Sequence, residues 1–267
     1  MARLAAHSLS GIPEVRAGED LGELIVAALQ ASQPALALTD GEIVAVAHKV
    51  VSKAEGAVVA LAEVVPSPRA LELAAEADAA AGGQAGEEHG KDPRAVQVVL
   101  DQSREVLRAA RGVLVCRTHH GFVCANAGVD ASNAPDPGTV IVLPADPDAS
   151  ARRLRSRLRE LTGARVGVLI GDSFGRAWRH GQCDVAIGCA GLTPLDDWRG
   201  RADSSGMELR ATWLAVADAI AATADLARAK DSSEPVVILG GLERFVTEED
   251  GPGAVALLRP LDEDLFR

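Results

Sequence analysis

The sequence feature that most constrains the fold is a short apolar run that leads into a polar, glycine-flanked pentapeptide. Residues 166–170 (VGVLI) have the composition of a buried strand, and GDSFG (171–175) follows as a predicted turn. Such a turn brings a carboxylate and a hydroxyl to one edge of a sheet. Arg176 and Arg179 come next, and this combination suits a metal ion and an anionic substrate. A solvated turn after a core strand is the alternative.

Composition limits the classes of protein that this chain can belong to. Its 267 residues, 48% of them hydrophobic, suffice for one large domain or two small ones. The net charge of −11 argues against a general binder of nucleic acids or membrane surfaces. The four cysteines lack C-x-x-C spacing, so the sequence indicates neither a zinc knuckle nor a disulfide framework, and we expect a cytoplasmic protein.

Apolar periodicity and turn residues predict an α/β protein. Turn-forming Gly, Pro and Asp residues separate the segments. Residues 81–91 are rich in glycine and are predicted to form a loop. The strands are expected at 42–51, 112–117, 139–143, 166–170 and 235–239, and the main helices at 20–31, 69–81, 92–110, 147–163 and 208–230.

Three further polar residues lie beside predicted strands or turns. Lys53 follows the strand at 42–51 and is a candidate contact for a phosphate or carboxylate, although a surface lysine is the simpler interpretation. Asp130 and Asn133 end a stretch of small residues, and an Asx turn is the alternative there. Carboxylates from two separate turns, Asp130 and Asp172, could hold Mg²⁺ or Mn²⁺ against a phosphate.

Several well-known motifs are excluded. GDSFG matches the G-x-S-x-G nucleophile elbow, but a hydrolase of that kind needs an acid and then a histidine downstream. His180 is the last histidine in the chain and lies only seven residues after Ser173, so the required order fails. No G-x-G-x-x-G fingerprint and no G-x-x-x-x-G-K-[ST] sequence occurs, and the fold is therefore predicted to be neither Rossmann nor P-loop.

One predicted helix, at 147–163, carries an unusual number of arginines. A cationic face that binds substrate is one interpretation. A solvated face paired with acidic side chains is favoured, because exposed arginines on helices are usually matched in that way. The residues are Arg152, Arg153, Arg155, Arg157 and Arg159.

Several stretches together resemble the coenzyme F420-0:L-glutamate ligase family, the γ-glutamyl ligases that extend coenzyme F420. The resemblance begins near residue 8 and covers almost the whole chain. It implies a mixed α/β fold with mixed sheets in a single domain over 1–267, which two intertwined subdomains could build, without an appended flavin-binding domain. The clearest stretches are GIPEVRAGEDL (11–21), DGEIVAVAHKVVSKAEG (40–56), HGFVCANAGVDASN (120–133), DPDASARRL (146–154) and residues 161–188.

The resemblance also implies an activity. Members use GTP to activate a carboxylate of coenzyme F420-0 as an acyl phosphate, and the amine of L-glutamate then displaces phosphate. Further glutamates are added through γ-links. Two Mg²⁺ or Mn²⁺ ions, stimulation by K⁺ and a homodimer are expected. A non-catalytic or repurposed homologue that binds a deazaflavin or nucleotide is the alternative.

Site residues are carried over by matching motifs. The metal would be held by Asp130, Asp172 and Ser173, whereas Arg176 and Arg179 are added as candidates for phosphate or carboxylate contacts. His48, His180, Cys183 and Ala229-Lys230 depart from the usual residues of the family. The expected GTP contacts are Ile12, Pro13, Glu14, Val15, His48, Lys53 and Asn133.

Overall fold

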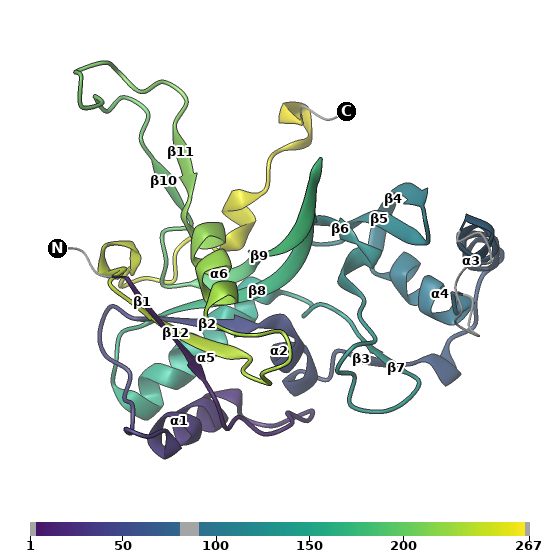
Figure 1. Ribbon diagram of the computed structural model, residues 1–267, viewed down its shortest axis with the longest axis horizontal. Helices are drawn as coiled ribbons and strands as arrows, with labels where there is room; N and C mark the ends of the chain where they lie inside the picture. The colour runs from purple at the N-terminus through teal and green to yellow at the C-terminus, as the bar shows by residue number, and fades with distance from the viewer. Residues whose placement is uncertain (1–3, 81–90, 265–267) are drawn as a thin grey trace.

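A five-stranded mixed sheet forms the centre of the protein (Figure 1). The computed structural model describes residues 4–80 and 91–264, so the predicted loop at 81–91 lies almost wholly outside the described residues. Within the sheet β2 and β8 are parallel and the other pairs are antiparallel, which confirms the predicted mixed α/β class. The strand order is β1 (Ala5–Leu9), β12 (Val236–Gly240), β2 (Ile43–Ala47), β8 (Gly167–Arg176) and β9 (Arg179–Ala190).

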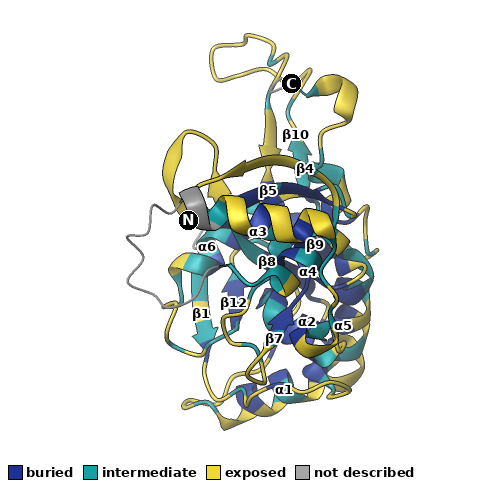
Figure 2. Ribbon diagram, turned by 90° about the vertical axis from the view of Figure 1, so that its right-hand side faces the viewer, coloured by how far each residue is buried: buried dark blue, intermediate teal, exposed yellow. Residues whose placement is uncertain are grey.

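Helices cover both faces of this sheet. Successive side chains of a strand point to opposite faces, so Val44 of β2 packs toward α1 (Leu21–Ala31) and α5 (Pro147–Thr162). Its neighbour Ala45 packs toward α6 (Val216–Leu226). Figure 2 shows the buried residues gathered in the strands and on the inner helix faces.

Local signals fix the ends of α1 and α5 where the sequence predicts them. The side chain of Asp20 accepts a hydrogen bond from the backbone nitrogen of Glu23 at 3.1 Å, as an N-cap does. Asp146 caps α5 in the same way, with Pro147 in its first turn. Gly163 ends α5 with φ at 76°, a left-handed conformation that suits glycine.

A smaller unit lies to one side of the main sheet (Figure 1). Its core includes Leu73, Val99 and Leu114, and all three are buried. Two sheets and two helices build it: β3 (Val58–Ala60) with β7 (Thr139–Ile141), β4 (Ser103–Ala110) with β5 (Val113–Thr118) and β6 (Val123–Ala125), α3 (Pro68–Ala80) and α4 (Pro93–Asp101).

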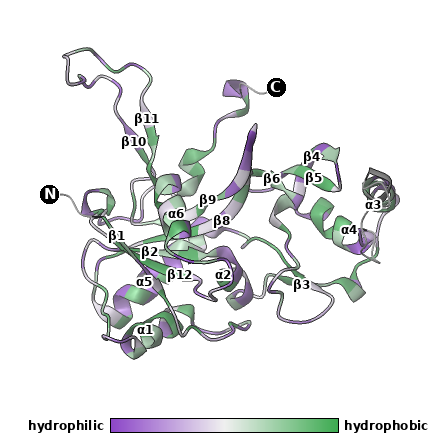
Figure 3. Ribbon diagram, viewed as in Figure 1, coloured by the Kyte–Doolittle hydropathy of each residue, from purple (hydrophilic) through white to green (hydrophobic). Residues whose placement is uncertain are grey.

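Two arms extend from the body. The hairpin of β10 (Leu195–Asp197) and β11 (Trp213–Ala215) projects away from the main sheet (Figure 1). The outer ends of β8 and β9 form the second arm, and Figure 3 colours its tip as hydrophilic. Among the described residues, no helix is long and apolar enough to cross a membrane.

The predicted turn at 171–175 is wrong, because β8 continues through it to Arg176. Ile170 faces Gly188 and Gly171 faces Ala186, so Ile187 is an extra residue on β9 and the ladder contains a bulge. The glycine thus marks a bulge within a strand rather than the end of one.

The predicted strand at 42–51 is half wrong. β2 ends at Ala47, and His48–Ala54 is the helix α2. A short continuous apolar run is compatible with a buried strand or a buried helix, and periodicity cannot separate the two. Two predicted helices are also too long, because residues 103–110 form β4 and α6 begins only at Val216.

Candidate functional site

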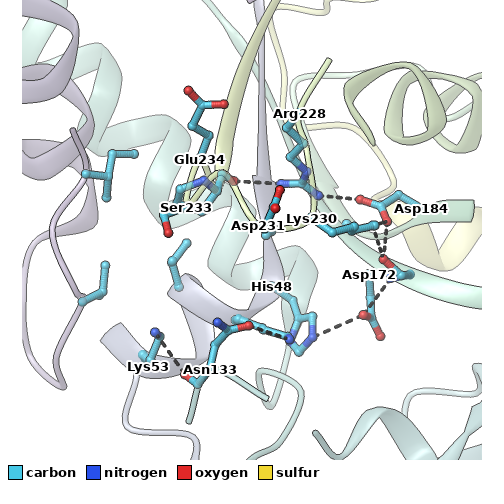
Figure 4. A pocket seen from close by; sticks show the side chains of 18 of the residues that line it. His48, Lys53, Asn133, Asp172, Asp184, Arg228, Lys230, Asp231, Ser233 and Glu234 are labelled. Atoms are coloured by element: carbon cyan, nitrogen blue, oxygen red, sulfur yellow. Dashed lines mark hydrogen bonds and ion pairs between the residues drawn. The ribbon is translucent and has the colours of Figure 1, made fainter. Parts of the chain in front are cut away.

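A cavity of about 440 Å³ lies at the junction of β2 and α2 (Figure 4). Separate parts of the chain form its walls: the early loop, the start of α2, the middle of β8 and the segment between α6 and β12. Most predicted site residues line it, namely Ile12, Pro13, Glu14, Val15, His48, Lys53, Asn133, Asp172 and Ser173.

Lys53 connects two walls of the cavity. It lies in the last turn of α2, and its side chain is only 5% exposed. Its Nζ donates to Glu14 Oε1 at 2.5 Å and to the carbonyl oxygen of Asn133 at 3.4 Å. A buried ammonium group needs such partners, because taking an unpaired charge out of water is costly. Lys53 therefore contacts two other residues that are predicted to bind GTP, Glu14 and Asn133.

Asp172 is oriented by the start of α2. His48 is buried, and its Nε2 lies 3.3 Å from Asp172 Oδ1. The same oxygen accepts a hydrogen bond from the backbone nitrogen of Ser173 at 2.7 Å. A carboxylate oxygen can only accept, so the tautomer of His48 with its proton on Nε2 is the neutral form that suits this contact.

Asp130 is held by the next residue of α2. Lys49 Nζ lies 2.8 Å from Asp130 Oδ2, and Ser132 donates to the same carboxylate through its backbone nitrogen and its hydroxyl. Burial of Asp130 acts to raise the pKa of its carboxyl, but the hydrogen bonds from Lys49 and Ser132 outweigh it and the pKa falls below the ordinary value. The two candidate carboxylates therefore contact successive residues of one helix, although only Asp172 is among the cavity-lining residues.

A second charged cluster surrounds the Ser173 hydroxyl. Ser173 Oγ donates to Asp184 Oδ1 at 2.5 Å and accepts from Lys230 Nζ at 2.8 Å. Arg228 Nη2 contacts the other oxygen of Asp184, also at 2.5 Å. Burial acts to raise the pKa of Asp184, but the Ser173 hydrogen bond and the two cations bring that pKa below its ordinary value.

Comparison with known proteins places the chain in a family. The sequence model described as F420-0:Gamma-glutamyl ligase matches residues 11–241. The chain belongs to this family. A relative named Coenzyme F420:L-glutamate ligase from Methanopyrus kandleri is 45% identical over 256 residues, which cover 95% of this chain and 94% of the relative. The protein of that name from Methanothermobacter thermautotrophicus is 42% identical over 260 residues, 97% of each chain.

The donor groups of this F420-0:γ-glutamyl ligase family member fit a divalent cation at the carboxylates. Carboxylate oxygens suit Mg²⁺ and Mn²⁺. In the part of the chain that the structure describes, no group of three or more His, Cys, Asp or Glu side chains could hold a metal by itself. An ion at Asp172 would therefore complete its coordination with substrate oxygens or water, as Mg²⁺ commonly does, and Asp130 would join it by giving up its ion pair with Lys49.

Two sequence candidates lie elsewhere. Arg176 and Arg179 face each other at the outer end of the β8–β9 arm, and both are exposed. Arg176 Nη2 donates to the carbonyl oxygen of His180 at 2.6 Å. Neither arginine lines the cavity. Their role as substrate contacts stays a prediction.

Sequence reasoning missed the anionic partner of the second cluster. Asp184 is 2% exposed and faces Ser173 directly across the β8–β9 ladder. A regular hairpin that turns at residues 177–178 would pair Ser173 with residue 182, and the register shift between Gly175 and Arg176 moves the partner to Asp184. Because the strand was predicted to end at Ile170, that pairing could not be deduced. Arg228, Ser233 and Glu234 were missed as well, since they come from a segment between regular elements.

Proposed function

We propose that this chain catalyses the GTP-dependent ligation of L-glutamate to coenzyme F420-0 and then adds further glutamates through γ-links. The observation that carries the proposal is the cavity itself, where Lys53, Asn133 and Asp172 meet from three distant stretches. Relatives named for this ligation match the chain over nearly its whole length, which supports the same assignment.

The proposed reaction has two steps. A carboxylate oxygen of F420-0 attacks the γ-phosphorus of GTP, the bond between that phosphorus and the β–γ bridging oxygen breaks, and GDP leaves. The amine of L-glutamate then attacks the carbonyl carbon of the acyl phosphate. The carbon–oxygen bond breaks, phosphate leaves with the electron pair, and the amine releases a proton. The γ-carboxylate of the product enters the next cycle in the same way.

The residues of the cavity have separate tasks in this proposal. Lys53 places a desolvated positive charge beside the phosphates. The electrostatic attraction between the two is stronger there than it would be in water. Asp172 and Asp130 would hold Mg²⁺ or Mn²⁺, which neutralises phosphate charge when bound. His48 keeps the Asp172 carboxylate in place. The early-loop residues that are expected to contact GTP also line the cavity, namely Ile12, Pro13, Glu14 and Val15.

From the family resemblance we also expect activation by K⁺, a homodimer and a cytoplasmic location. Light scattering of the purified protein tests the dimer. Replacing K⁺ by Na⁺ in the assay tests the activator, with slower turnover expected.

Trapping the acyl phosphate tests the mechanism. Purified protein is supplied with F420-0, GTP, Mn²⁺ and hydroxylamine in place of L-glutamate. We expect the hydroxamate of F420-0 and one GDP for each hydroxamate. Asp172→Asn should form neither product while keeping the circular dichroism spectrum of the folded protein. GDP release without hydroxamate would rule out the acyl phosphate.

A further inference from the structure

The Ser173 hydroxyl is already bound on both sides. Its proton goes to Asp184, and its oxygen accepts from the ammonium group of Lys230. A divalent ion coordinated by Ser173 Oγ would have to sit beside that ammonium group, where two positive charges repel each other strongly. Ser173 therefore does not fit the role of a metal ligand in this chain.

Lys230 is held in place by more than Ser173. Its Nζ lies 2.6 Å from Asp225 Oδ1 and 3.3 Å from Asp184 Oδ1. Asp184 in turn is fixed by Arg228, whose guanidinium also donates to the carbonyl oxygen of Pro235 at 3.1 Å. The ammonium group of Lys230, at the end of a side chain that is 62% exposed, thus lies at the cavity wall within reach of three oxygen partners (Figure 4).

The charges of this cluster balance without a metal ion. Two carboxylates, Asp184 and Asp225, are matched by two cations, Arg228 and Lys230. Asp184 accepts at both of its oxygens, and its side chain is 3% exposed. A second divalent ion bound to Asp184 would have to displace a cation from this buried acid.

We propose that Lys230 supplies the positive charge beside the transferred phosphoryl group that a second divalent ion would otherwise supply, so that the site holds one ion per chain. Its 3.3 Å contact with Asp184 is the longest of its three, and a phosphate oxygen would take its place. Asp184 is then a positioning residue, because it fixes Lys230, Arg228 and Ser173 without contacting substrate. The inference rests on the proposed GTP-dependent ligation.

Counting Mn²⁺ tests this directly. The protein is saturated with GDP and titrated with Mn²⁺, and bound ions are counted from the loss of the free-ion electron paramagnetic resonance signal, corrected for Mn²⁺ held by free GDP. We expect one ion per chain for the wild type and two for Lys230→Glu, which replaces the ammonium group by a carboxylate. Arg152→Glu makes the same change of charge on α5, outside the cavity, and should bind one.

The outcomes separate the two proposals. Two ions in the wild type would overturn the assignment of Lys230, even if Lys230→Glu failed to fold. One ion in a folded Lys230→Glu that still binds GDP would overturn it as well. Absence of both Mn²⁺ and GDP binding would overturn the proposed function itself, whereas a two-ion wild type leaves that function standing.

Discussion

At the scale of single residues, the cavity depends on charges that are paired and partly withdrawn from water. Lys53 is the clearest case, because its ammonium group is nearly inaccessible and its partner Glu14 is 62% exposed on the side chain. Removing the lysine therefore leaves an acid that water can solvate. We therefore expect the loss of Lys53 to weaken ligand binding while the free energy of unfolding changes little.

We predict that Lys53→Met weakens GDP binding about 10- to 100-fold, the range expected when a hydrogen bond to a charged group is lost. Isothermal titration calorimetry in the presence of Mn²⁺ measures it. Arg69→Met removes an exposed cation on α3 and should leave the dissociation constant unchanged. An unchanged constant for Lys53→Met would place the nucleotide elsewhere.

Asp218 gives a pH dependence with a definite sign. Burial raises its pKa above 3.8, although the backbone nitrogen of Ala186 donates to its carboxylate and acts the other way. The native state then binds a proton at a pH where the unfolded chain does not. The free energy of unfolding therefore rises as pH falls through the native pKa of Asp218. The rise ends near pH 3.8, where the unfolded chain is protonated too.

The wild type should therefore gain stability relative to Asp218→Asn as pH falls from 7 toward 4, because the variant cannot take up that proton. Urea unfolding of both proteins at several pH values measures the difference. A constant difference, or one that moves the other way, would contradict the burial of this carboxyl.

At the scale of elements, α5 packs so closely on β9 that one position must be glycine. A Cβ at Gly188 would collide with the backbone carbonyl of Pro147, which cannot rotate away. We predict that Gly188→Ala lowers the free energy of unfolding by about 1–3 kcal/mol, as overpacking does. Gly175 on β8 is the matched control, since a Cβ there has nothing within 4 Å. Equal stabilities of the two variants in urea would refute the close contact.

The sequence predicted elements best where local chemistry decides. Asp20 and Gly163 mark helix ends through their own hydrogen bonds and backbone angle, so both helices were found. Sequence-based prediction was wrong where contacts between distant segments determine the structure. His48–Ala54 is helical although its apolar run suits a strand equally well. Asp184 belongs to the site through strand register, which no local pattern encodes.

At the scale of the whole molecule, one buried arginine ties the C-terminal segment to the main sheet. Arg155, on the helix predicted to carry only solvated arginines, is 8% exposed. It donates to the carbonyl oxygens of Val166, Thr247 and Glu248 and to Asp250 Oδ1. The predicted pairing with acidic side chains at the surface is found for Arg153, Arg157 and Arg159.

We predict that Arg155→Lys costs about 3 kcal/mol of stability, because one ammonium group cannot reach all four acceptors and buried polar groups lose their partners. Arg159→Lys, on the same helix but exposed, should change stability by about 0.5 kcal/mol or less. Urea denaturation compares them. A loss for Arg155→Lys no larger than that for Arg159→Lys would remove its role as a tether.

At the scale of the whole molecule we also propose that the chain joins L-glutamate to coenzyme F420-0 with GTP as the co-substrate. Mass spectrometry of a reaction that contains purified protein, coenzyme F420-0, L-glutamate, GTP and Mn²⁺ tests it most directly. We expect products heavier by successive glutamyl units, with one GDP formed per unit added. No glutamylated product from a folded protein that binds GDP and Mn²⁺ would contradict the claim and favour a homologue that binds its ligands without joining them.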